Sequence, residues 1–171
     1  GFIAREAAKR DVGISPIASF YADHYIRAFV RIEKGAKEAD RALEKLGYCH
    51  YEPKYLDRLY SPQADEKCIG PIWIERTSDP GILANLRIPR NLETVDRIIS
   101  LSEMLVSESR LNRPFFDIDE FARKPKRNPI PMRRLISKLN ETGFATRTHY
   151  GPKTFSTSKS IEEIEEIFIR G

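Results

Sequence analysis

The segment from Pro131 to Ser158 constrains the fold most, because it predicts a helix followed at once by a hairpin. Proline is tolerated in the first turn of a helix and glycine is favoured just past its end, so Pro131 and Gly143 mark the limits of the helix. Residues 144–150 are rich in β-branched and aromatic side chains, and a glycine-proline pair then turns the chain into residues 154–158. We therefore expect two short strands directly after the helix.

The helix has an apolar and a cationic face. Leu135, Ile136 and Leu139 recur at helical spacing and are expected to face inward. The outward positions and the hairpin carry the cations Arg133, Arg134, Lys138, Arg147 and Lys153. A helix followed by a hairpin is the order of the recognition helix and wing of a winged-helix module, here with a cationic surface.

The charge of the chain is concentrated in this region. The net charge is only +4, yet residues 123–159 hold ten Lys or Arg against one Glu, and several of the ten lie in a proline-punctuated turn at 124–131. Residues 1–122 hold 18 basic and 20 acidic residues. Such a patch is typical of proteins that bind a phosphate backbone. A solvated charged surface without a nucleic-acid partner is the alternative.

The beginning of the chain predicts a helix and a second hairpin. Residues 2–10 are expected to be helical, and residues 17–21 and 24–32 to form paired strands. The second strand alternates with period two, so Arg27 and Arg31 share a face with aromatic residues. This face suits base stacking and phosphate contact. A strand packed under a helix, with its arginine tips in water, is an equal alternative.

The chain divides into three regions and belongs to the α+β class. We expect a first region at residues 1–34, a connecting α/β region with a loop insertion at 35–90, and a winged-helix-like module at 91–171. The connecting region is read as a helix over 36–46, a loop or ribbon over 48–70 and a strand over 71–75, and the longest helix as 92–111. Capping boxes that begin at Asp117 and Ser160 open two further helices.

Motifs for catalysis or metal binding are missing from the sequence. It contains no glycine-rich phosphate loop, no Gly-x-Ser-x-Gly and no His-Glu-x-x-His, so we assign no catalytic or cofactor-binding residue. Cys49, His50 and Cys68 leave a fourth zinc ligand unnamed, and no zinc is expected. His149 has no carboxylate nearby in sequence, so a hydrogen bond to nucleic acid or within the hairpin is favoured over acid–base chemistry. Tyr150 either stacks on a base or packs the hairpin.

The composition favours a water-soluble protein of a reducing compartment. No apolar run approaches the roughly 18 residues of a membrane span, so no membrane partner is expected. Two cysteines suit the cytoplasm, although the sequence leaves a disulfide open. The chain begins at Gly1 within a predicted helix and without an initiator Met, and we expect a fragment of a longer, monomeric protein.

Four segments carry a resemblance to a known family. Residues 1–11, 23–31, 70–74 and 145–149 resemble, in order and approximate spacing, the second half of the archaeal and eukaryotic tRNA guanine-26 N2-dimethyltransferases. The strings Asp-His-Tyr-x-Arg from Asp23 and Thr-Arg-Thr-His from Thr146 are the most specific when taken together.

The resemblance implies that two domains of the enzyme have separate roles. In that family a Rossmann-like methyltransferase domain, which binds S-adenosylmethionine, precedes a family-specific domain that helps to hold tRNA. Residues 2–10 would be the last helix of the methyltransferase domain and residues 14–32 its terminal hairpin. The cofactor and catalytic motifs would lie upstream, so this chain alone is expected to be inactive. Many members carry a four-cysteine zinc ribbon at the position of residues 48–70, where this chain has only Cys49 and Cys68, which suggests a metal-free loop.

The expected function is therefore tRNA binding within an enzyme that methylates or dimethylates the N2 atom of guanine 26, with S-adenosylmethionine as donor. A non-enzymatic winged-helix regulator that binds DNA is the main alternative, and a protein-docking module is the third. The residues expected to contact RNA are the cations of both hairpins and of the basic helix together with one histidine: Arg27, Arg31, Arg133, Arg134, Lys138, Arg147, His149 and Lys153.

Overall fold

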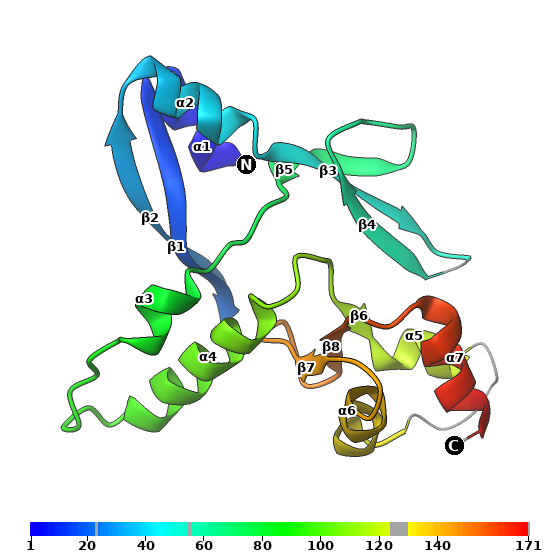
Figure 1. Cartoon of the computed structure of the whole chain (residues 1–171). Coiled ribbons are helices and arrows are strands. Elements are labelled where there is room, and N and C mark those ends of the chain that lie inside the picture. Colours follow the sequence, from blue (N-terminus) through cyan, green and yellow to red (C-terminus); the bar gives the residue numbers. More distant parts are fainter. Residues whose placement is uncertain (23, 55, 124–129, 171) are drawn as a thin grey trace.

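The computed structural model describes residues 1–22, 24–54, 56–123 and 130–170. It is a mixed α+β structure with three small antiparallel sheets, ordered β1-β2, β4-β3-β5 and β6-β8-β7 (Figure 1). This confirms the expected class. Asp23 and most of the proline-punctuated basic turn, at 124–129, lie outside the described residues.

The first region forms a long hairpin, on which its own helix and the first helix of the connecting region pack. Its elements are α1 (Phe2–Ala8), β1 (Val12–Ala22), β2 (Tyr25–Lys34) and α2 (Ala36–Leu43). The predicted hairpin is confirmed, with Ile14 opposite Ile32, but β1 starts earlier than expected. Gly13 lies inside β1, where a β-carbon would collide with the Glu38 carbonyl of α2. The glycine therefore allows α2 to lie directly on the strand.

The far half of β1 is fastened to the helices that follow. A bulge leaves Ile17 outside the strand pairing, and its carbonyl accepts a hydrogen bond of 2.9 Å from the Asp79 amide. Asp79 caps α3 (Pro80–Ala84), where its side chain accepts from the Ile82 amide. Ala18 then packs in a small core with buried residues of α3 and of α4 (Val95–Glu108). The hairpin thus contacts helices at both of its ends.

The connecting region is an ordered sheet. The part expected as a loop or ribbon forms β3 (Leu46–Glu52) and β4 (Asp57–Ser61), and β5 (Cys68–Trp73) pairs with the other edge of β3. The helix predicted to end at Leu46 ends at Leu43 instead. Leu46 already pairs with Trp73, and a β-carbon on Gly47 would lie 2.5 Å from the Ser61 carbonyl oxygen. Close strand packing, rather than helix capping, explains this glycine.

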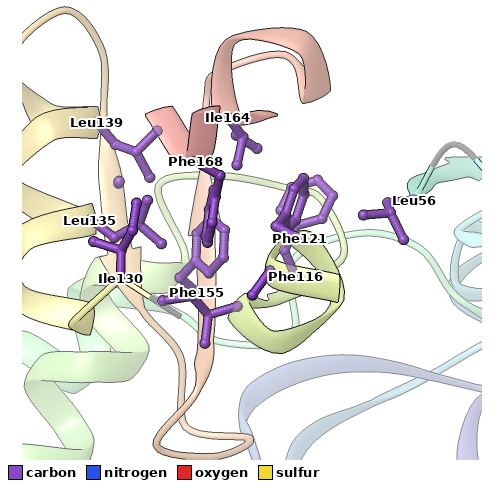
Figure 2. Packing of buried hydrophobic residues seen from close by; sticks show 12 residues of the cluster. Leu56, Phe116, Phe121, Ile130, Leu135, Leu139, Phe155, Ile164 and Phe168 are labelled. Carbon is purple, nitrogen blue, oxygen red and sulfur yellow. The ribbon is translucent and has the colours of Figure 1, made fainter. Parts of the chain in front are cut away.

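The C-terminal module contains the largest core. Its elements are β6 (Phe116–Asp117), α5 (Ile118–Arg123), α6 (Met132–Asn140), β7 (Ala145–Arg147), β8 (Thr154–Thr157) and α7 (Ile161–Arg170). Phe116, Phe121, Phe155 and Phe168 meet at its centre, as Figure 2 shows, and neighbouring ring centroids lie 5.7–6.1 Å apart. Leu135 and Leu139 of α6 are fully buried, as predicted from their spacing.

The ends of the helices in this module follow the sequence signals in part. Ser160 and Glu163 make both hydrogen bonds of the predicted capping box. Helix α6 ends at Asn140, three residues before the expected glycine stop, because the Asn140 side chain bonds the amide and the carbonyl of Ala145. Helix α4 is shorter at both ends than predicted, and its Ile99 is exposed. Within the described ranges, no helix has the length and apolarity needed to cross a membrane.

Candidate nucleic-acid interface

Helix α6 presents cations without acidic partners. Arg133 and Arg134 are exposed, and Lys138 is half-buried beside Leu139. No ion pair within the described residues involves any of the three. Arg133 and Arg134 are therefore available to a phosphate backbone, whereas Lys138 lines a pocket together with Glu141 and Glu163.

Strand β7 adds a fourth cation beside this helix. Arg147 is exposed on β7, which packs against α6, and it too has no ion pair in the described part of the chain. On the other side of the strand, the Ser107 hydroxyl of α4 donates to Thr146, with 2.9 Å between the oxygens. We call Arg133, Arg134, Lys138 and Arg147 the α6–β7 surface.

Lys153 differs from these four because it is paired. Its ammonium donates to Asp119 over 2.6 Å, and this hydrogen bond raises the pKa of Lys153. The side chain keeps 58% of its surface exposed. A phosphate would have to compete with this carboxylate, so Lys153 is a weaker candidate than the α6–β7 surface.

His149 is buried rather than presented to solvent. Only 3% of its side chain is exposed. Its backbone amide and its ring Nδ1 both donate to the Glu108 carboxylate at the end of α4, over 2.6 and 2.8 Å. The sequence near His149 contains no carboxylate that predicts this contact, because Glu108 precedes it by 41 residues.

Tyr150 continues a stack of three rings. Its ring centroid lies 4.4 Å from that of Phe115 and 4.0 Å from that of His149. It is also 45% exposed. The ring therefore packs within the fold and offers part of its surface to solvent.

Arg27 and Arg31 lie in a different part of the molecule. Both are exposed on β2, and the Arg27 guanidinium lies 4.8 Å from the ring centroid of Tyr25. Figure 1 draws β2 at the upper left and α6 at the lower right. Four of the predicted residues lie on α6 and β7, which pack together, whereas these two arginines lie on β2.

The cysteines lie on neighbouring strands without forming a metal site. Cys49 of β3 and Cys68 of β5 are free thiols, and burial raises the pKa of Cys49. His50 is held between Asp65, at 2.6 Å, and the Gln63 carbonyl, and the hydrogen bond to Asp65 raises the pKa of His50. Among the described residues, no group of three or more His, Cys, Asp or Glu could hold a metal ion.

An ion pair that the sequence does not predict joins the middle sheet to the C-terminal module. Arg58 of β4 donates to both oxygens of Glu120 in α5, over 2.6 and 2.8 Å, and to the Phe115 carbonyl. The two side chains are largely buried. A charged pair 62 residues apart leaves no signal in the local pattern.

The comparison with known families decides what kind of protein this is. A model described as TRM, the N2,N2-dimethylguanosine tRNA methyltransferases, matches residues 1–169. The chain belongs to this family. The match confirms the resemblance drawn from the four sequence segments.

Individual members of the N2,N2-dimethylguanosine tRNA methyltransferase family agree with this assignment. The chain is 34% identical to the tRNA (guanine(26)-N(2))-dimethyltransferase of Pyrococcus horikoshii, with 99% of this chain and 46% of that protein covered. It is 31% identical to the Methanococcus maripaludis enzyme, with 96% and 45% covered. A solved complex of Trm1 from P. horikoshii with S-adenosyl-L-methionine matches with a TM-score of 0.81 and 33% identity, over 96% of this chain and 46% of that one. The chain thus spans slightly less than half the length of these relatives.

Proposed function

We propose that this chain is the tRNA-holding part of an enzyme that methylates the N2 atom of guanine 26 of tRNA, with S-adenosylmethionine as methyl donor. The observation that carries the proposal is the α6–β7 surface, a set of unpaired cations in a member of a tRNA methyltransferase family. Arginine and lysine neutralise phosphates, and proteins recognise folded RNA more by its shape and backbone than by its sequence.

The reaction explains why such an enzyme needs a holding surface. The exocyclic amine of guanine is a weak nucleophile and is paired or stacked in folded tRNA, so the base has to be exposed before it can react. Exposing a base costs stacking and pairing energy. Phosphate contacts on α6 and β7 would hold the rest of the tRNA while the base is presented.

The proposal assigns the three regions as follows. Residues 1–34 are the end of a Rossmann-like methyltransferase domain, residues 35–90 connect, and residues 91–171 form a winged-helix-like module. The exposure of Ile26 (77%), Ile32 (65%) and Phe2 (69%) supports the first assignment, because further protein would cover these side chains. The order helix, strand, helix, helix and hairpin from α4 to β8 supports the last.

S-adenosylmethionine does not fit the residues of this chain. Gly35, which opens α2 directly after β2, is the one glycine with a positive φ among the described residues, and its amide is already bonded to the Asp11 carbonyl. The described residues thus lack a glycine-rich turn with free amides, so we route no step of the reaction through them. The proposal places the donor, and the chemistry, in the rest of the enzyme and makes this chain inactive alone.

The test measures tRNA affinity of the whole enzyme as a function of salt concentration. Arg134, Lys138 and Arg147 are replaced together by alanine. Each lost phosphate contact lowers the slope of log K against log [salt] by roughly 0.7–0.9, so we expect a slope smaller by about 2 and an affinity at least tenfold lower. The matched control replaces three exposed cations, Lys9 just after α1 and Lys37 and Arg41 in α2, and is expected to change the slope little.

Two outcomes would refute the proposal. Equal affinity and slope in the wild type and in the α6–β7 variant would show that this surface does not hold tRNA. Stronger binding of duplex DNA than of folded tRNA, measured in competition, would favour a DNA-binding regulator.

A further inference from the structure

A cavity of about 380 Å³ lies where three separate elements meet. Its walls are the end of β1 with Tyr21, one face of α4 with Arg97, Ser100 and Met104, and the residues after β7 with His149 and Tyr150. Pockets that bind small groups range from about 300 to 1,000 Å³, so this cavity has room for one ring system rather than two. No residue of the α6–β7 surface lines it.

His149, in the wall of the cavity, has a buried polar atom without a partner among the described residues. The Glu108 carboxylate accepts from Nδ1, so we assign the ring proton to Nδ1 and leave Nε2 with an accepting lone pair. Nε2 is buried and has no hydrogen-bond partner within the part of the chain that the structure describes. Because nearly all buried polar groups in folded proteins are satisfied, an orphan of this kind indicates a missing partner.

The walls also supply flat aromatic surface. Tyr21 and Tyr150 both line the cavity and are 43% and 45% exposed. Phe115 and His149 already cover the two sides of the Tyr150 ring, so Tyr21 supplies the aromatic surface that is open to a ligand. Unstacked bases bind to such aromatic surfaces, and a base edge can donate to a histidine nitrogen.

We propose that this cavity binds one unstacked nucleobase of the bound tRNA, stacked on Tyr21 and hydrogen-bonded through its edge to His149 Nε2. The inference rests on the proposed function and extends it, from holding the phosphate backbone to capturing a base.

The path of the RNA supports this ligand. Arg147 of the α6–β7 surface lies only two residues before His149 in the same hairpin. An RNA strand whose phosphate contacts Arg147 therefore passes close to the cavity. A base next to that phosphate can then enter the cavity while the phosphates stay on α6 and β7.

The experiment uses two variants of the whole enzyme that remove the site in different ways. His149→Asn keeps an amide that can donate to Glu108 in place of Nδ1 but removes Nε2. Ser100→Trp places a large ring in the cavity from an exposed position of α4. For each protein we measure tRNA affinity, its salt slope, and the chemical reactivity of every tRNA base on its Watson–Crick edge.

In the wild type we expect one or two bases to be protected in the complex. In both variants this protection is lost and affinity falls by roughly tenfold, the usual effect of losing one stacked base. The salt slope stays unchanged, because the phosphate contacts remain. Ile99→Trp is the matched control: it adds the same ring one position away, outside the residues that line this cavity, and keeps the wild-type protection.

The base pocket and the proposed function can fail separately, and the measurements tell the two cases apart. If the α6–β7 variant loses tRNA affinity but both cavity variants bind and protect like the wild type, the base pocket is wrong and the proposed function stands. If the wild-type enzyme does not bind tRNA, both fail. If one of the variants no longer melts like the wild type, Tyr21→Ala takes its place, because Tyr21 is exposed. The same loss or retention of base protection then decides the proposal.

Discussion

At the scale of single residues, Glu108 makes the most consequential polar contact in the hairpin. It accepts hydrogen bonds from two groups of His149, and its own side chain is only 15% exposed. Glu108→Ala leaves a backbone amide and a ring nitrogen without partners. Hydrogen bonds to charged groups contribute about 1.5–3 kcal/mol each, and because two are lost we expect the free energy of unfolding to fall by about 3–6 kcal/mol.

Urea denaturation measures this change through the midpoint of the transition at an unchanged m-value. Glu103→Ala serves as the control, because Glu103 is exposed on the same helix and is expected to change stability by less than about 0.5 kcal/mol. Equal midpoints for the two variants would contradict a structural role for Glu108.

The contact between His50 and Asp65 should make the stability of the middle sheet depend on pH. The hydrogen bond to Asp65 raises the pKa of His50 above its usual 6.5. A raised pKa in the folded state means that this contact stabilises fully at pH values below 6.5 and is lost as the pH rises through the folded-state pKa. We expect an NMR titration of the imidazole to show this, and Asp65→Asn to bring the pKa of His50 down. An unchanged titration in the variant would exclude Asp65 as the cause.

The sequence predicts buried residues better than their polar partners. Leu135 and Leu139 were found because an amphipathic helix repeats its apolar residues at a fixed spacing. The carboxylate of Glu108 could not be assigned to His149, because nothing local relates residues 41 positions apart. The burial of His149 follows from that contact and was therefore missed as well.

At the scale of elements, the contact of α2 with β1 depends on a missing side chain. A β-carbon at Gly13 would meet the Glu38 backbone. Gly13→Ala therefore forces α2 away from the strand, and overpacking of this kind costs about 1–3 kcal/mol. Gly151→Ala is the control, because the nearest atom to a β-carbon there is 3.9 Å away. Thermal melting of both variants checks the difference, and equal melting temperatures would contradict the close approach.

Elements with a strong local pattern were predicted and the middle sheet was predicted only in part. The basic helix and its hairpin contain a proline start, an apolar stripe and a turn signal, and all three elements are present. In β3–β5 the polar and aromatic residues do not alternate cleanly, so pairing across the sheet decides the strands. Leu46 shows this: its spacing suits the preceding helix, yet it pairs with Trp73.

At the scale of the whole molecule, β2 carries an apolar face that this chain does not cover. Ile26 is 77% exposed and Ile32 is 65% exposed. If the rest of the enzyme covers them, as proposed, one double substitution has opposite effects in two contexts. Ile26→Thr with Ile32→Thr is expected to raise the solubility of this chain alone and to lower the stability of the whole enzyme by about 2 kcal/mol.

Leu59→Thr provides the comparison, because Leu59 is 47% exposed on a different sheet. Sedimentation of the chain and thermal melting of the whole enzyme give the two readouts. Stability of the whole enzyme unchanged by the double substitution would show that β2 stays open to solvent there.

The charge pattern predicted which part of the molecule is basic but not how that part is placed. Ten cations between residues 123 and 159 indicate the region without any knowledge of the fold. The sequence grouped Arg27 and Arg31 with these cations by residue type, whereas Figure 1 places β2 and α6 apart. Only packing between elements sets such distances.

The β1–β2 hairpin has one more consequence. One half of β1 packs with α1 and α2, through Ala4, Ile14 and Ala42, and the other half packs with α3 and α4, through Ala18. The length of the hairpin therefore sets the distance between these two groups of helices. Adding two residues to each strand would keep every side chain on its face and lengthen the hairpin by about 7 Å. Strand length therefore sets how far α1 and α2 lie from α3 and α4.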